Sequence, residues 1–281
     1  MNRLLILLFF LLPALGFSQE EKPKNWQLNG YIKNMQTLIF FNDTAGVFVQ
    51  DNLIHNRLNF RWYLSEQFTF RAELRTRVFF GDLVRANPDY AKLVDNVNND
   101  FFDLSLVLLD DNSWVIHSML DRLYLEYVKN NLEVRVGRQR INWGINTVWN
   151  PNDIFNAFSF TDFDYEERPG SDAVRIKYYT GIASSFEVAA RIYNVFEKDS
   201  LNQEKIIAGL WKINKWNYDF QVLAGYVKDD LVLGGGWAGN IKTASFKGEF
   251  SYFHALDERR KDAFAATFGV DYSIHSAQFC W

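Results

Sequence analysis

Apolar and polar residues alternate along most of the chain. Between Ile54 and Phe80 the even positions are nearly all apolar, whereas the odd positions carry five arginines, Arg57, Arg61, Arg71, Arg75 and Arg77. A period of two is typical of an extended strand with one apolar face and one wet face. The pattern therefore predicts two strands here, at 52–64 and 67–80.

The same alternation recurs along the chain and predicts about twelve strands. These are 26–41, 52–64, 67–80, 114–128, 131–142, 172–179, 185–196, 206–213, 217–227, 231–240, 243–254 and 263–275. Their lengths suit strands that cross a bilayer at a tilt.

The links between these strands alternate in length. Short links are expected at 65–66, 129–130, 180–184, 214–216 and 241–242. The intervening links are 42–51, 81–113, 143–171, 197–205, 228–230 and 255–262, and only 228–230 is shorter than its side would suggest. Short turns on the periplasmic side and long loops outside are typical of membrane barrels. The sequence therefore predicts an all-β fold, a transmembrane antiparallel up-and-down β-barrel.

A secreted two-sheet sandwich is the alternative, because its strands also alternate. A sandwich core favours Val, Ile and Leu, whereas here aromatic residues gather at strand ends. They are Trp62, Tyr63, Tyr178, Tyr179, Trp211, Trp216, Tyr218, Tyr226 and Tyr252. Aromatic girdles of this kind mark the two membrane interfaces, and only a closed barrel leaves no unpaired backbone edge in lipid. The barrel is favoured.

The N-terminal segment indicates export. Residues 1–18 combine Arg3, an apolar run from Leu4 to Leu12 and a small-residue end at 16–18, which is the pattern of a secretory signal peptide. We expect residues 19–281 to form the barrel and the mature protein to lie in the outer membrane, in contact with its lipid.

Composition excludes other classes of protein. The 281 residues carry a formal net charge of −4, which argues against nucleic acid as a partner. The single cysteine, Cys280, cannot form an internal disulfide. None of the four histidines shows a metal-ligand spacing or a serine-nucleophile motif. We therefore expect neither an enzyme nor a cofactor.

The arginines of the first strand pair define a register. If facing residues sum to 132, Trp62 lies opposite Phe70 outside, and Arg61 and Arg57 lie opposite Arg71 and Arg75 inside. One interpretation is an anion-attracting ladder on the pore wall. The alternative, which the alternation of Arg and Glu at 122, 126, 133, 135 and 191 slightly favours, is that acids of neighbouring strands, such as Glu126, Glu133 or Glu187, balance the arginines. The candidate lumen arginines are Arg57, Arg61, Arg71, Arg75, Arg77, Arg122, Arg135, Arg138 and Arg175.

Residues 136–179 resemble the outer-membrane porins of the alginate-export and phosphate-selective type. The matching motif residues are Gly137, Arg138, Gln139, Trp143, Gly144, Asn150, Pro151, Asp153, Arg168, Gly170, Asp172 and Arg175. The resemblance implies passive diffusion through a lumen narrowed by an inward-folded loop. Independently, Asp153 is a suitable N-cap for a short helix at 154–158, whose apolar residues would pack on the inner wall.

The sequence thus predicts a porin for small hydrophilic solutes, with anions favoured if the ladder is functional. Two rival classes stay open: a barrel enzyme of the outer-membrane phospholipase type, and a non-conducting structural or secretion barrel. The end of the chain breaks the parity, since Phe279 and Trp281 are odd whereas the outward set through Ile274 is even. A turn at 276–278 is expected, as in a fragment of a barrel of about 16 to 18 strands. A closed twelve-stranded barrel is the alternative.

Overall fold

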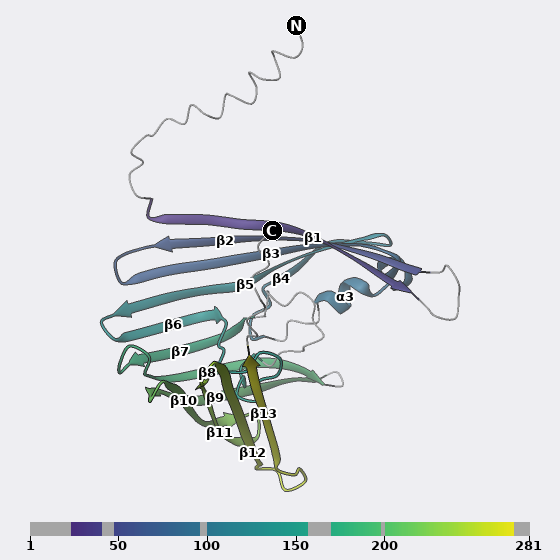
Figure 1. The fold of residues 1–281 in the computed structure, drawn as a ribbon. Coiled ribbons are helices and arrows are strands. Elements are labelled where there is room, and N and C mark those ends of the chain that lie inside the picture. Colours follow the sequence, from purple (N-terminus) through teal and green to yellow (C-terminus); the bar gives the residue numbers. More distant parts are fainter. Residues whose placement is uncertain (1–23, 41–47, 96–99, 157–169, 198–199, 273–281) are drawn as a thin grey trace, which may run out of the picture.

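A single curved sheet makes up most of the protein (Figure 1). The computed structural model describes residues 24–40, 48–95, 100–156, 170–197 and 200–272. The expected signal peptide at 1–18 and the expected turn near 276–278 lie outside these residues. The strands are β1 (Trp26–Phe40), β2 (Phe48–Tyr63), β3 (Phe68–Gly81), β4 (Ser105–Asp111), β5 (Trp114–Lys129), β6 (Leu132–Gln139), β7 (Ser171–Tyr179), β8 (Ser185–Glu197), β9 (Ser200–Lys215), β10 (Tyr218–Val227), β11 (Asp230–Ile241), β12 (Ala244–Ala255) and β13 (Ala263–Tyr272).

The strands follow one another in an antiparallel up-and-down order, as predicted. The order is β1-β2-β3-β5-β6 and then β7 to β13 in sequence, with β4 off this path. β6 pairs with Leu123–Lys129 of β5, and β4 pairs with the other half of the same edge, Trp114–Met119. Among the described residues β1 and β13 are not paired with each other, so the structure is not the closed twelve-stranded barrel of the alternative.

The expected long loop at 81–113 is more ordered than the sequence suggested. It contains β4 and two short helices, α2 (Asp82–Ala86) and α3 (Tyr90–Asp95). With β4 the described residues form thirteen strands, in agreement with the prediction of about twelve. Among the described residues, no helix is long and apolar enough to cross a membrane.

The strict alternation of link lengths is wrong at one further point. A long link was expected at 197–205, but β9 begins at Ser200 and only 198–199 separate it from β8. The polar residues of 200–205 extend β9 because they pair with 192–197 of β8. The longest links still share one side of the sheet, and the links on the other side have at most five residues.

The two faces of the sheet differ as the parity predicts. In β10, Phe220 and Val222 are 37% and 50% exposed, whereas Gln221 and Leu223 between them are 4% and 1% exposed. In β2 the contrast is between Leu58, 42% exposed, and Arg57, 5% exposed. The apolar face therefore lies on the convex, outer side of the sheet. The polar face lies on the concave side, where other segments of the chain cover much of it.

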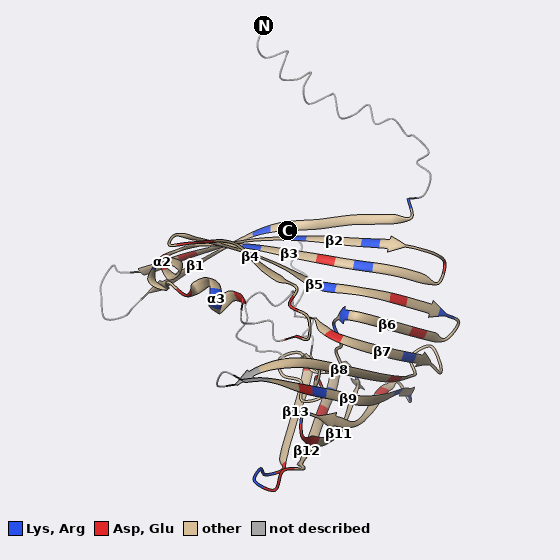
Figure 2. Ribbon diagram, turned by 180° about the vertical axis from the view of Figure 1, so that it is seen from behind, with Lys and Arg blue, Asp and Glu red and all other residues tan. Residues whose placement is uncertain are grey.

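Segments that fold inward provide this cover. The larger apolar cluster joins Ile141, Trp143 and Phe155 of the link after β6 to inward residues of β7 to β11. The smaller cluster joins Val84 and Ala91 of the two helices to the inner faces of β3 and β5. The link after β6 and the helical segment after β3 both pack on the concave side. The main polar part of this side is formed by the charged residues of β2, β3, β5 and β6 (Figure 2).

Candidate functional site: the inner wall

The register of β2 and β3 is the predicted one. Arg61 faces Arg71, Arg57 faces Arg75, and His55 faces Arg77. Trp62 lies opposite Phe70 on the outer side of the same pair. The five arginines therefore share the inner face of one hairpin.

A carboxylate of β5 neutralises the centre of this ladder. Arg57 Nη1 lies 2.7 Å from Asp121 Oδ2, Arg75 Nε lies 3.1 Å from the same oxygen, and Arg57 Nη2 lies 2.5 Å from Glu73 Oε2. Asp121 is fully buried, and both arginines are less than 10% exposed. The facing like charges at 57 and 75 are thus bridged by one acid between them.

Asp121 reaches this position through a β-bulge that was not among the predicted features. Glu73 pairs with Arg122, yet the next residue of β3, Leu74, pairs with Leu120. Asp121 is the extra residue, and an extra residue in one strand re-aims the side chains around it. Arg122 donates from Nη1 to the Asp121 carbonyl oxygen at 2.7 Å. The sequence signal for this bulge is a change of parity within β5. The inner face carries odd-numbered residues up to Asp121 and even-numbered ones, Tyr124 and Glu126, after it.

A second ion-pair cluster lies toward the short-link side. Arg135 pairs with Glu126 and, at 3.0 Å, with Glu133. Glu133 also pairs with Arg175 and accepts a hydrogen bond from the Tyr179 hydroxyl at 2.8 Å. For these arginines the interpretation of balancing acids is confirmed. Glu187 does not balance an arginine in this cluster; its Oε1 accepts a hydrogen bond from Trp143 Nε1 at 2.7 Å.

Arg61 and Arg71 differ from the rest of the ladder. Among the described residues neither has a carboxylate within ion-pair distance. Arg61 donates to the Tyr63 hydroxyl at 3.2 Å, and the Arg71 guanidinium lies 6.0 Å from the Tyr124 ring centre. Both line a polar cavity of about 200 Å³ together with Gln27, Asn29, Phe60, Asn59 and Glu73. This is the part of the wall where positive charge is least compensated.

Arg77 is held near the helices at the long-link end. Its Nη2 lies 3.2 Å from His117 Nδ1, and its guanidinium lies 5.2 Å from the Phe79 ring centre. His117 Nε2 in turn lies 3.1 Å from Asp95 Oδ1 at the end of α3. Arg77 therefore belongs to the packing of α3 against the wall.

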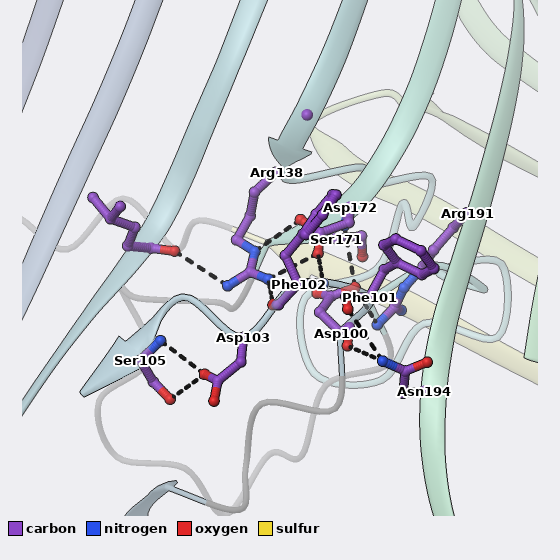
Figure 3. Close-up of polar contacts among 12 residues, drawn as sticks. Asp100, Phe101, Phe102, Asp103, Ser105, Arg138, Ser171, Asp172, Arg191 and Asn194 are labelled. Carbon is purple, nitrogen blue, oxygen red and sulfur yellow. Dashed lines mark hydrogen bonds and ion pairs between the residues drawn. The ribbon is translucent and has the colours of Figure 1, made fainter. Parts of the chain in front are cut away.

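Arg138 does not share the inner face with the other candidates, which corrects its placement in the lumen. It pairs directly with Asp172 at the ends of β6 and β7, in line with the outward Val136 and Val174. Its Nε and Nη2 lie 2.9 and 2.8 Å from the two Asp172 oxygens (Figure 3). The alternation of β6 itself places Arg138 there, because Arg138 has the same even parity as the outward Val136.

The link after β6 lies on the inner wall, as the family resemblance implied. Glu249 Oε2 accepts from the Ile145 backbone N–H at 2.6 Å, and Gln221 Nε2 donates to the Trp143 carbonyl at 2.7 Å. Phe155 is 1% exposed and packs edge-to-face on Trp143, with ring centres 4.9 Å apart. The helix expected from Asp153 onward is not formed at 154–156; 157–158 lie outside the described residues. Hydrogen bonds to the wall hold this segment in place instead, including one from Asn152 Nδ2 to the Gly235 carbonyl at 3.0 Å.

A glycine-rich stretch of β11 makes room for this link. A Cβ on Gly234 would lie 2.7 Å from Asn152 Oδ1, and one on Gly236 would lie 2.7 Å from Ile145 Cδ1. Glycine within a strand often marks a place where another segment approaches closely. Here the close partner is the inward-folded link.

The described residues offer few features of an enzyme. His117 lies within hydrogen-bond distance of Arg77 and Asp95, and His254 within hydrogen-bond distance of Asp262. Within the described ranges, no group of three or more His, Cys, Asp or Glu side chains is arranged to hold a metal ion. The expectation that the protein is not an enzyme stays a prediction.

Comparisons with known proteins do not identify a family. No protein-family model matches the chain, and no curated protein matches it. Among solved structures it is similar to in-vitro folded OmpT, an outer membrane protein of Vibrio cholerae in a trimer form. That match has a TM-score of 0.33 and 9% identity, and covers 90% of this chain and 86% of the other. A similarity of this size supports no further conclusion, so the resemblance to alginate-export and phosphate-selective porins stays a prediction.

Proposed function

We propose that the protein is an outer-membrane β-barrel porin through which small hydrophilic solutes diffuse, with anions favoured. The observation that carries the proposal is the distribution of side chains across the sheet, which is the reverse of that in a soluble protein. Charged residues are buried on the concave side, and large apolar residues are exposed on the convex side. Exposed apolar residues are Leu28, Ile32, Leu58, Leu125, Val136, Val174, Ile176, Val188, Ile207, Val222, Leu233, Phe264, Phe268 and Val270.

Lipid is the environment that this convex face fits. A soluble monomer rarely exposes an apolar patch of more than a few hundred Å², whereas a barrel in a membrane carries an apolar band on all its strands. Here the exposed positions recur from β1 to β13. The lipid of the outer membrane is therefore the proposed partner of this face.

The anion preference rests on Arg61 and Arg71. Most other lumen arginines have acid partners, so their charges are largely cancelled at short range. A fixed charge acts over about a Debye length, near 8 Å at physiological salt, and can bias the ions that enter a narrow pore. The pair at 61 and 71 therefore supplies positive charge that no described ion pair cancels.

The inward-folded link is proposed to set the width of the pore. Replacing Trp143 with alanine removes the side chain that joins this link to Glu187 of the wall and packs on Phe155 within the link. We expect a larger single-channel conductance in planar bilayers, because the released segment no longer narrows the lumen. Trp149→Ala is the control, since Trp149 lies in the same link but is 49% exposed.

The same experiment tests the alternative of a non-conducting structural barrel. The packing of links on the inner wall is compatible with that alternative, because such links can fill a lumen. A porin conducts in its wild-type form, and the Trp143 variant conducts more. A structural barrel gives no channels with either protein. Equal conductance of the two variants and the wild type would contradict the role given to the link.

The orientation can be tested with cysteines in a Cys280→Ser background. Leu93, in α3, is 57% exposed on the side of the long links, and Asn131 lies in a two-residue link on the other side. Leu93→Cys should react with an impermeant thiol reagent on intact cells, and Asn131→Cys should react only after lysis. The reverse result would contradict the orientation.

A further inference from the structure

An apolar groove lies on the outer side of the wall, where β6 and β7 end. It encloses a volume of about 590 Å³ and is almost free of polar surface. Its lining includes Phe101, Phe102, Leu104, Val136, Val174 and Ala190. No part of the proposed pore uses this groove.

The register shows that the groove opens outward. Val136 faces Leu125 on one side and Val174 on the other, and Val174 faces Ala190. Val136 and Val174 are 51% and 44% exposed. The floor of the groove is therefore a continuation of the apolar band proposed to contact lipid.

The roof is the segment 100–104, which crosses the ends of β6 and β7. The Phe102 N–H donates to Asp172 Oδ2 at 2.8 Å, Arg138 binds the Phe102 carbonyl, and Asn194 Nδ2 donates to the Phe101 carbonyl at 3.1 Å (Figure 3). Asp100 anchors its start, accepting a hydrogen bond from the Asp172 N–H at 3.1 Å and lying 3.4 Å from Arg191. The phenylalanines are thus fixed in place over the floor.

The Asp100 carboxyl lies outside the strands. Its burial raises its pKa, and the nearby Arg191 guanidinium opposes that shift. The contact between Asp100 and Arg191 joins the roof to β8.

We propose that this groove binds an acyl chain of a membrane amphiphile. The inference rests on the proposed membrane location. The polar groups at its edge, Arg138 and Asp172, are occupied by each other and by the roof, so a peptide or sugar would find few hydrogen-bond partners. The roof makes the site concave, and a hydrocarbon chain enters it more readily than the flat wall of a second copy.

The test uses the full chain in phosphatidylcholine vesicles that contain a phosphatidylcholine with a diazirine on one acyl chain. After illumination, the cross-linked peptides are mapped. We expect cross-links at 101–104 well above those at other outward positions. Ala190→Trp fills the groove and should abolish the excess, whereas Ala224→Trp, on an exposed outward position of β10, should leave it unchanged.

Each outcome bears on a stated claim. Labelling along the whole apolar band without an excess at 101–104 overturns the groove proposal and leaves the membrane location intact. The absence of labelling anywhere on the band overturns both. Dimers cross-linked by a bis-maleimide through Phe101→Cys or Phe102→Cys in a Cys280→Ser background, together with no lipid label at 101–104, assign the groove to a second copy and also overturn the proposal. Conductance like that of the wild type verifies that Ala190→Trp is folded.

Discussion

Replacing Asp121 with alanine should lower the free energy of unfolding by about 3–5 kcal/mol, the usual cost of removing one partner from a buried ion pair. The carboxylate lies within 3.1 Å of both Arg57 and Arg75, and all three groups are buried. Its loss leaves two arginines facing each other across the β2–β3 pair without the carboxylate that both of them contact. Urea unfolding of the protein in lipid vesicles measures the change.

Asp111→Ala is the matched control, because Asp111 is exposed at the end of β4. Surface substitutions of this kind usually change stability by no more than about 0.5 kcal/mol. If Asp121→Ala were as mild as the control, the carboxylate would not hold the ladder together. The account of the inner wall as a set of compensated charges would then be wrong.

Leu58→Arg should cost about 2–4 kcal/mol, the range for a basic side chain facing the middle of a bilayer. Leu58 is 42% exposed on the convex face and lies between Gly30 and Leu74. An arginine there would have neither water nor a carboxylate close by. The measurement is the same unfolding experiment in lipid.

Thr69→Arg makes the same change on the wet face. Thr69 lies opposite Glu126, so the new charge has water and an acid nearby, and we expect little loss of stability. Equal costs at the two positions would contradict the assignment of the faces.

Local sequence patterns were sufficient to predict the pairing of β2 with β3 and the side of the sheet on which their residues lie. Side chains alternate with a period of two, and a short link leaves few registers, so the parity of Trp62 and Phe70 specified the pairing of Arg61 with Arg71. The same reasoning placed Phe220 and Val222 outside in β10. These features depend on neighbours in sequence or across one turn.

Other features depend on contacts that no local pattern encodes. The bulge at Asp121 changes the parity within β5, so its carboxylate could not be assigned to the ladder. β4 occupies an edge of β5 that is free only because β6 ends at Gln139. Arg138 is a different case, because it shares the even parity of Val136 and its outer side follows from the alternation of β6. The inward path of the link after β6 depends on glycines of β11, about 90 residues further along the chain.

The central claim is a water-filled pore whose selectivity comes from Arg61 and Arg71. Changing both to glutamine removes two charges without breaking any described ion pair, so the barrel should still fold. Changing Arg259 and Lys261 to glutamine removes two charges from the exposed link after β12 and serves as the control.

The most direct measurement is the reversal potential of the open channel in a salt gradient across a planar bilayer. The account predicts an anion-selective wild type, a shift toward cations in Arg61→Gln/Arg71→Gln that fades at high salt, and no shift in the control. The same reversal potential for wild type and the ladder variant would contradict it.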